Sequence, residues 1–148
     1  MRWLVGFLCL VLVACGGGDG DDSDSSENLS DAEDRIVAAV ETIYKNQAGR
    51  TFDEYLVPGQ REQIDREHFI TCNTETAGVD AEIEVEESYS EMTDVPTIGD
   101  VETAAVTYQL SANDQTITNT SHAVEVDGEW YVFYNQERFD AYVAGDCP

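Results

Sequence analysis

Residues 122–135, HAVEVDGEWYVFYN, carry the strongest indication of the fold in this 148-residue chain. Apolar and polar side chains alternate before Asp127 and Gly128, and a segment of aromatic and β-branched residues, WYVFY, follows at residues 130–134. An Asp-Gly pair between two segments of strand-forming residues is a strong signal for a β-hairpin. The pattern predicts two antiparallel strands, over residues 116–126 and 129–135, at the end of a sheet.

The sequence is consistent with two registers of this hairpin. A two-residue loop pairs Val126 with Glu129. A three-residue loop that ends in a glycine bulge instead pairs Val124 with Trp130 and turns His122 inward. We favour the second register, because it gathers the apolar side chains of both strands on one face and leaves the glutamates in water.

Two earlier segments, over residues 81–90 and 101–110, show the same alternation. In the first of them Ile83 and Val85 share one face, and the other face carries Glu82, Glu84 and Glu86. Four consecutive strands, each with one polar face, predict an antiparallel sheet whose other face is covered by helices.

Helices are expected in the first half of the chain. Ser30 and Glu33 have the spacing of a capping box, and apolar residues follow at helical spacing until Gly49. A short turn is predicted over residues 51–56, and another helix over residues 60–71 after Pro58. The expected fold class is therefore α+β, in a single domain over residues 30–148.

The segments AEDRIVAAVETIYKNQAGRTFDEYLVP and VEVDGEWYVFYN resemble small actinobacterial lipoproteins and secreted proteins with a nuclear-transport-factor-2-like, or SnoaL-like, fold. The resemblance implies a cystatin-like cone, in which N-terminal helices pack on a curved antiparallel sheet of about four strands and one end often opens as a ligand pocket. Enzymes such as ketosteroid isomerase share this fold with many non-catalytic proteins, so the fold alone does not choose a function.

The N-terminus has the pattern of an export signal. Residues 1–14 have a basic start at Arg2 and an apolar segment too short to span a bilayer. LVAC, ending at Cys15, resembles the bacterial lipoprotein box, which implies cleavage before Cys15 and lipid attachment to its thiol. An ordinary secreted protein cut nearby is the alternative. The lipoprotein interpretation predicts a chain anchored in the cell membrane on its extracytoplasmic side.

Residues 15–29 are rich in glycine, serine and aspartate, and are expected to form a disordered acidic tether. Without Arg2 the chain holds six basic against 31 acidic residues. This balance argues against a nucleic acid partner, since phosphate contacts need clustered Lys and Arg.

Export also bears on the cysteines. Cys72 and Cys147 remain as a pair once the signal is removed and Cys15 is lipidated, and a disulfide between them is expected. A metal site is the competing interpretation, but His68 is the only histidine near Cys72 in the sequence. We expect no metal site and no cofactor.

The expected role is non-catalytic binding of a small apolar ligand or of an envelope protein. The alternative is a cofactor-free enzyme of the isomerase or dehydratase type, with Glu87 and His122 as acid–base groups and Tyr108 as a hydroxyl donor. Regular alternation places Glu87 on the inner face, whereas a bulge beside Glu86 would turn it outward. For His122 we prefer the interpretation as a hydrogen-bonded core residue, and for Tyr108 that as a packing residue.

Overall fold

The computed structural model describes residues 22–148, with side chains from Asn28 onward. The elements follow one another as α1 (Asp22–Tyr44), α2 (Ala48–Arg50), the π-helical turn η1 (Thr51–Tyr55), α3 (Pro58–Arg61), α4 (Arg66–Cys72), β1 (Ala81–Val95), β2 (Gly99–Ala112), β3 (Gln115–Val126), β4 (Glu129–Val132) and α5 (Gln136–Ala144). The α+β class expected from the sequence is confirmed. The predicted signal peptide and Cys15 lie outside the described residues.

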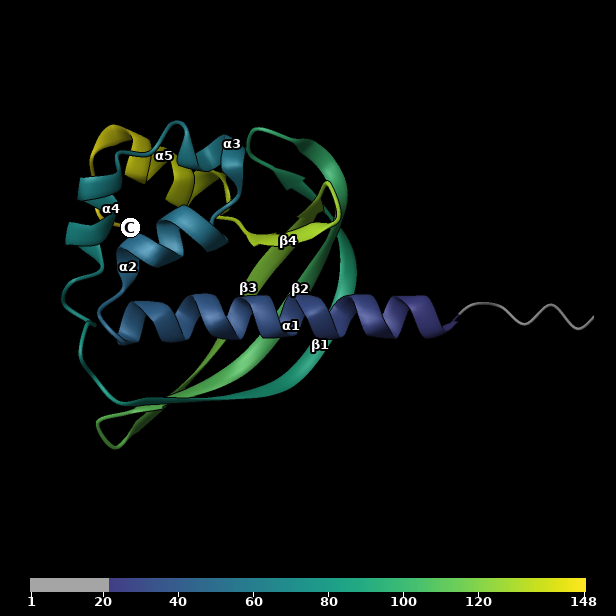
Figure 1. The fold of residues 1–148 in the computed structure, drawn as a ribbon, viewed down its shortest axis with the longest axis horizontal. Helices are drawn as coiled ribbons and strands as arrows, with labels where there is room; N and C mark the ends of the chain where they lie inside the picture. Colours follow the sequence, from purple (N-terminus) through teal and green to yellow (C-terminus); the bar gives the residue numbers. More distant parts are fainter. Residues whose placement is uncertain (1–21) are drawn as a thin grey trace, which may run out of the picture.

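The four strands form one antiparallel sheet in the order β1-β2-β3-β4. The sheet is strongly curved, and α1 lies across its concave side (Figure 1). The shorter helices α2 to α5 gather near the C-terminal end of α1 (Figure 1). Among the helices within residues 22–148, none combines the length and apolarity needed to cross a membrane.

Two apolar clusters meet beside α1. The first joins α1 to the concave face of the sheet through Ala32, Ile36, Ala104, Val106, Tyr108, Leu110 and Ala123. The second joins the short helices through Ala48, Phe52, Leu56, Ile64, Phe69, Phe139 and Tyr142. Burial of this apolar surface is the main force that holds the helices on the sheet.

The first helix begins earlier than the capping box predicts. It starts at Asp22, so the part of the expected tether from residue 22 to residue 29 is helical, and Ser30 lies within the helix. Leu29 packs against the first apolar cluster. The Trp130 indole also donates a hydrogen bond to the Asn28 side chain, at 3.3 Å. These contacts hold the part of the helix that directly precedes Ser30 against the end of the sheet.

The favoured register of the last hairpin is wrong. In the structure Val126 pairs with Glu129 and Val124 with Tyr131, which is the two-residue loop. Asp127 and Gly128 both have positive φ, 54° and 82°. This is the backbone of a type I′ turn, whose twist matches that of the two strands.

Two further predictions, one of a helix and one of a strand, need correction. The single helix expected over residues 60–71 is divided into α3 and α4, because the Asp65 side chain caps a new helix by accepting a hydrogen bond from the His68 N–H. Strand β4 ends at Val132 rather than at residue 135. Asn135 instead caps α5, a helix that the sequence analysis does not predict.

Candidate functional site

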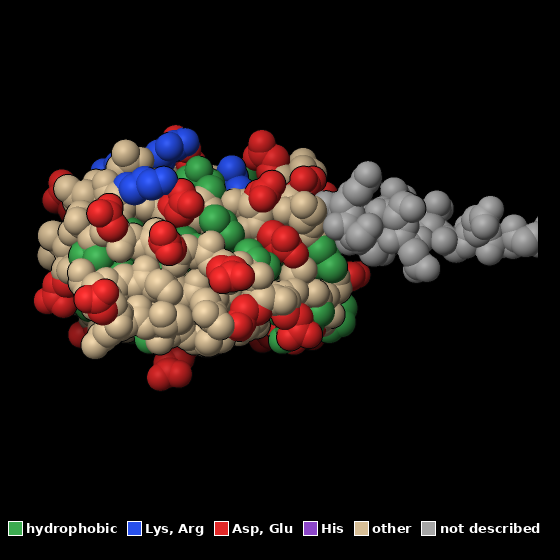
Figure 2. Space-filling view, turned by 90° about the horizontal axis from the view of Figure 1, so that it is seen from below, with side chains coloured by type: hydrophobic (Ala, Val, Ile, Leu, Met, Phe, Trp, Pro, Cys, Tyr) green, Lys and Arg blue, Asp and Glu red, His purple; other side chains and the backbone are tan. Residues whose placement is uncertain are grey.

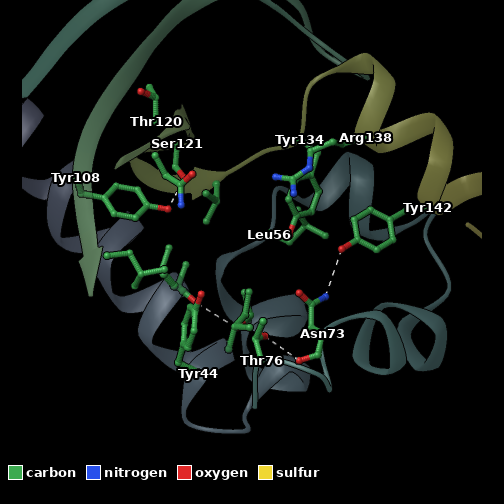
Figure 3. A pocket seen from close by; sticks show the side chains of 17 residues that line it. Tyr44, Leu56, Asn73, Thr76, Tyr108, Thr120, Ser121, Tyr134, Arg138 and Tyr142 are labelled. Carbon is green, nitrogen blue, oxygen red and sulfur yellow. Dashed lines mark hydrogen bonds between the residues drawn. The ribbon is translucent and has the colours of Figure 1, made fainter. Parts of the chain in front are cut away.

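A cavity of about 260 Å³ lies between α1, the concave face of the sheet and α5. Tyr44 reaches it from α1, Tyr108 from β2, and Arg138 and Tyr142 from α5 (Figure 3). Asn73, which directly follows α4, closes another side (Figure 3). The cavity therefore lies where the first and second apolar clusters meet and leave space between them.

The cavity has an apolar floor and a polar mouth. Ala39, Leu56 and Leu110 line it, and each is nearly fully buried. The exposed residues that line it are all polar: Thr76, Asn119, Thr120 and Arg138. A molecule bound here would place an apolar part inside and a polar part at the surface.

Tyrosines supply most of the polar groups between floor and mouth. The hydroxyls of Tyr108 and Ser121 lie 3.1 Å apart. The Asn73 amide donates to the Tyr142 hydroxyl at 3.3 Å. Burial raises the pKa of Tyr44 and of Tyr134 above the ordinary value of 10.0, so both phenols are protonated at neutral pH. These groups give the cavity hydrogen-bonding capacity without negative charge.

Among the described residues, 22–148, Arg138 is the one charged residue that lines the cavity. Its guanidinium lies 5.7 Å from the centre of the Tyr134 ring (Figure 3). Within the described part of the chain it forms no ion pair. The cavity of a strongly acidic chain thus presents a cation and no carboxylate.

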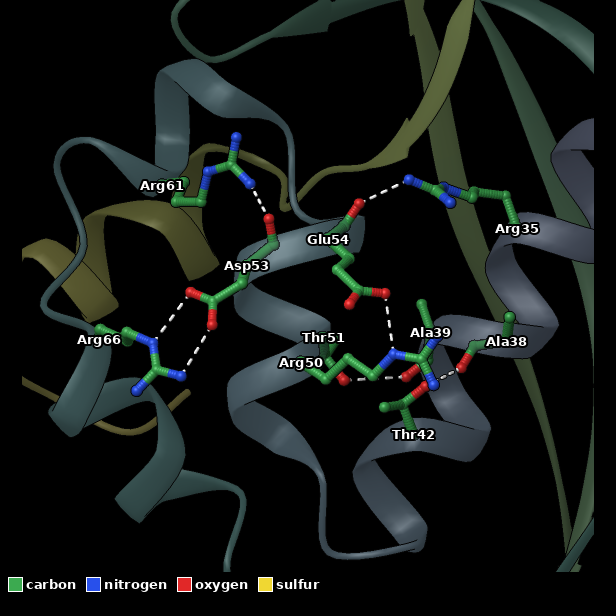
Figure 4. Close-up of polar contacts among 10 residues, drawn as sticks. All are labelled: Arg35, Ala38, Ala39, Thr42, Arg50, Thr51, Asp53, Glu54, Arg61 and Arg66. Atoms are coloured by element: carbon green, nitrogen blue, oxygen red, sulfur yellow. Dashed lines mark hydrogen bonds and ion pairs between the residues drawn. The ribbon is translucent and has the colours of Figure 1, made fainter.

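A second group of charges surrounds η1, on the wall that contributes Thr51 to the cavity. Arg66 donates two hydrogen bonds to the Asp53 carboxylate, at 2.9 and 2.7 Å, and Arg50 donates to Glu54 at 2.8 Å (Figure 4). The hydrogen bonds from Arg66 hold the pKa of Asp53 below its ordinary value. Arg61 and Arg35 bind the backbone carbonyls of Asp53 and Glu54, respectively (Figure 4).

The guanidinium groups of these arginines are hydrogen-bonded within the domain. We therefore interpret this group of charged residues as a structural support for η1. Figure 2 shows acidic side chains spread over the visible face, whereas Lys and Arg lie along one edge. Arg35, which packs over the Tyr55 ring at 4.5 Å, also donates to the backbone carbonyl of Trp130 at 2.8 Å. It thereby ties α1 both to η1 and to β4.

The structure does not bring the three candidate catalytic residues together. Tyr108 lines the cavity, but Glu87 and His122 do not. The register between β1 and β2 shifts between Val85 and Glu87, and this bulge leaves Glu87 exposed, as the outward alternative describes.

His122 was expected to point inward and does not. It pairs with Ala105, one position from Val106 of the core, so it lies on the sheet face opposite to Tyr108. There its ring is 2.9 Å from the Glu91 carboxylate. The two-residue hairpin loop is the reason, since it shifts the pairing of this strand.

The disulfide expected from the sequence is present and joins Cys72 to Cys147, with Cα atoms 5.3 Å apart. It ties the end of α4 to the segment that follows α5. The fold also places His68 beside it, with Nε2 3.4 Å from the Cys72 sulfur and 3.1 Å from the Asp146 carbonyl. His68, Cys72 and Cys147 could offer one nitrogen and two thiolates to a metal only after reduction of the disulfide.

Sequence reasoning missed the residues that α5 brings to the cavity, above all Arg138 and Tyr142. The signals for this helix are Asn135 as its N-cap, an apolar pair three positions apart, and Gly145 with φ of 84° after its last turn. The arrangement as a whole can enclose a small amphipathic molecule. No protein-family model, curated protein or solved structure matches this chain.

Proposed function

We propose that this domain binds a small, mainly apolar molecule in the cavity between α1, the sheet and α5, without transforming it. The apolar floor of Ala39, Leu56 and Leu110 under a polar mouth is the observation that carries the proposal. An apolar cavity of about 150 Å³ is enough to bind benzene. The space here, about 260 Å³, suits a ring system or a short alkyl chain with one polar group.

Binding is favoured over catalysis because the acid–base pair of the enzymatic alternative does not face this space. Glu87 is exposed at a bulge, and His122 lies on the other face of the sheet. A proton-transfer site needs its groups within hydrogen-bond reach of one substrate.

The test starts from the full chain purified from its own envelope in detergent. Native mass spectrometry should detect a bound small molecule, and adding that molecule should raise the melting temperature. Ala39→Phe, which fills the floor of the cavity, should abolish both effects, while Ala38→Phe, one position along the same helix and outside the lining, should not. A ligand retained by Ala39→Phe would contradict the proposal.

We further propose that the sheet and helices form the cone of the nuclear-transport-factor-2-like fold. The curved meander with α1 across its concave side supports this proposal (Figure 1). An experimental structure that superimposes all four strands and α1 on a member of that family would support it. A different strand order or helix placement would contradict it.

The membrane anchor is a separate proposal, supported by the LVAC motif at residues 12–15. We propose that Cys15 carries lipid and holds the domain on the extracytoplasmic side of the cell membrane. Metabolic labelling with an alkyne-bearing fatty acid should mark the full chain. Cys15→Ser should remove the label and release the protein from the membrane fraction, whereas Cys9→Ser should change neither. Label retained by Cys15→Ser would contradict it.

A further inference from the structure

We infer that the ligand of this cavity is an anion, an amphipathic monocarboxylate whose carboxylate binds the Arg138 guanidinium at the mouth. The inference rests on the proposed binding function and adds the charge of the ligand to it. In the described residues, the basic side chains other than Arg138 all have partners within the domain. Arg50, Arg66 and Lys45 pair with carboxylates. Arg35 and Arg61 donate to backbone carbonyls.

Arg138 differs from all of these. Among the contacts within residues 28–148, its guanidinium has a stacking contact with Tyr134 and neither an ion pair nor a hydrogen bond to a carbonyl. The chain has 31 acidic residues against seven basic ones, so a partner for each arginine would be easy to supply. An arginine left over at the mouth of a cavity is therefore available to a ligand.

The composition of the lining points the same way. Seventeen residues line the cavity, and none of them is Asp or Glu. A carboxylate at the mouth would thus meet the Arg138 cation without a neighbouring like charge in the lining. The planar guanidinium matches a carboxylate with two parallel N–H···O bonds.

Neighbouring groups add donors for such an anion. The Tyr142 hydroxyl accepts a hydrogen bond from Asn73, and a hydroxyl that accepts can also donate its own proton. The Tyr142 ring packs against the Tyr134 ring, with centroids 5.2 Å apart, and its hydroxyl points toward Asn73 (Figure 3). A single guanidinium with neutral donors suits a monoanion, and the apolar floor suits the ligand's hydrocarbon part.

The net charge of the protein predicts the opposite preference. At a formal charge of −24, the general field of the chain attracts cations and repels anions. Three probes with one ring system separate the two effects: 2-naphthoate, neutral 2-naphthamide and 2-naphthylmethylammonium. If the Arg138 guanidinium decides the preference, the naphthoate should bind best. If the negative net charge of the protein decides it, the ammonium should bind best.

The experiment titrates each probe into the full chain in detergent by calorimetry, at physiological ionic strength. The naphthoate should bind at least tenfold more tightly than the naphthamide. Arg138→Gln should remove that advantage, because it should weaken naphthoate binding far more than naphthamide binding, and Arg138→Lys should keep part of it. Lys45→Gln makes the same change of charge at the exposed residue that directly follows α1, outside the lining of the cavity, and should preserve the preference.

Equal binding of naphthoate and naphthamide would overturn the anion inference but leave cavity binding intact, provided that Ala39→Phe blocks both probes. A preference that survives Arg138→Gln would also overturn it. If none of the three probes binds, or if Ala39→Phe blocks none, the proposed function itself fails.

Discussion

The side chain of Gln60 binds both backbone groups of Tyr134. Its Nε2 donates to the Tyr134 carbonyl at 2.7 Å, and its Oε1 accepts from the Tyr134 N–H at 2.9 Å. Gln60 is 0% exposed. Tyr134 lies between the end of β4 and the start of α5, where the chain has left the sheet. The Gln60 amide takes the place of a neighbouring strand and fixes the approach to Arg138.

Replacing Gln60 by Met is expected to lower the free energy of unfolding by about 2–4 kcal/mol, because two buried backbone groups lose their partners at about 1–3 kcal/mol each. Urea unfolding followed by circular dichroism measures this loss. Gln63→Met changes an exposed glutamine nearby and should shift the midpoint little. A loss below about 0.5 kcal/mol for Gln60→Met would show that water replaces the amide.

Gly128→Ala tests the hairpin turn. A Cβ at Gly128 would meet no atom within 4 Å, so the φ of 82° is the source of any cost. For a residue other than glycine the left-handed conformation costs about 1–2 kcal/mol. Thermal unfolding should show this loss for Gly128→Ala and a smaller one for Gly128→Asn, since Asn tolerates the conformation better. Equal stability of all three proteins would contradict the type I′ geometry.

The position of this turn could be predicted from the sequence, but its register could not. In the true register Glu125 lies opposite Trp130, so a polar and an aromatic residue share one face. A regular alternation pattern does not predict that pairing. It is stabilised from outside the hairpin, since Asn28 and Leu29 of α1 cover this end of the sheet. The start of α1 and the register therefore depend on each other.

The candidate site shows the same limit. A period of two placed Tyr108 correctly, but it cannot show where a strand skips a residue, and the bulge before Glu87 decides which face that residue takes. Arg138 was missed for a different reason, because its helix is short and its apolar pair packs on α4 and η1, far away in sequence. Local patterns predicted the elements, and contacts between distant segments assembled the cavity.

Loss of the disulfide should destabilise the domain and weaken its cavity. Cys72 and Cys147 are 75 positions apart, and the chain-entropy model gives about 4 kcal/mol for closing such a loop. The double variant Cys72→Ser, Cys147→Ser should lose about this much in urea unfolding. Because α5 then loses its tie to α4, naphthoate affinity should fall as well. Reductant should lower the stability of the wild-type protein and leave that of the serine variant unchanged. A wild-type protein whose stability does not change with reductant would contradict this expectation.

The bond between Asp53 and Arg66 should contribute to stability in a pH-dependent way. The hydrogen bonds from Arg66 lower the pKa of folded Asp53 below its unfolded value of 3.8, so the unfolded chain binds the proton more readily. The contribution is therefore present above that value and is lost as the pH falls through the folded pKa. Both side chains are about half exposed, at 49%, so the effect on the melting temperature should be small.

Asp53→Asn should accordingly melt below wild type at about pH 7 and at the same temperature as wild type at about pH 2. Removing any carboxylate also relieves repulsion in this acidic chain, which acts in the opposite direction. Asp94→Asn, an exposed carboxylate with no ion pair in the described residues, measures that relief and should be subtracted. High salt should shrink the corrected difference, because it screens exposed pairs. A corrected difference that persists at about pH 2 would mean that Asp53 acts through packing rather than through its charge.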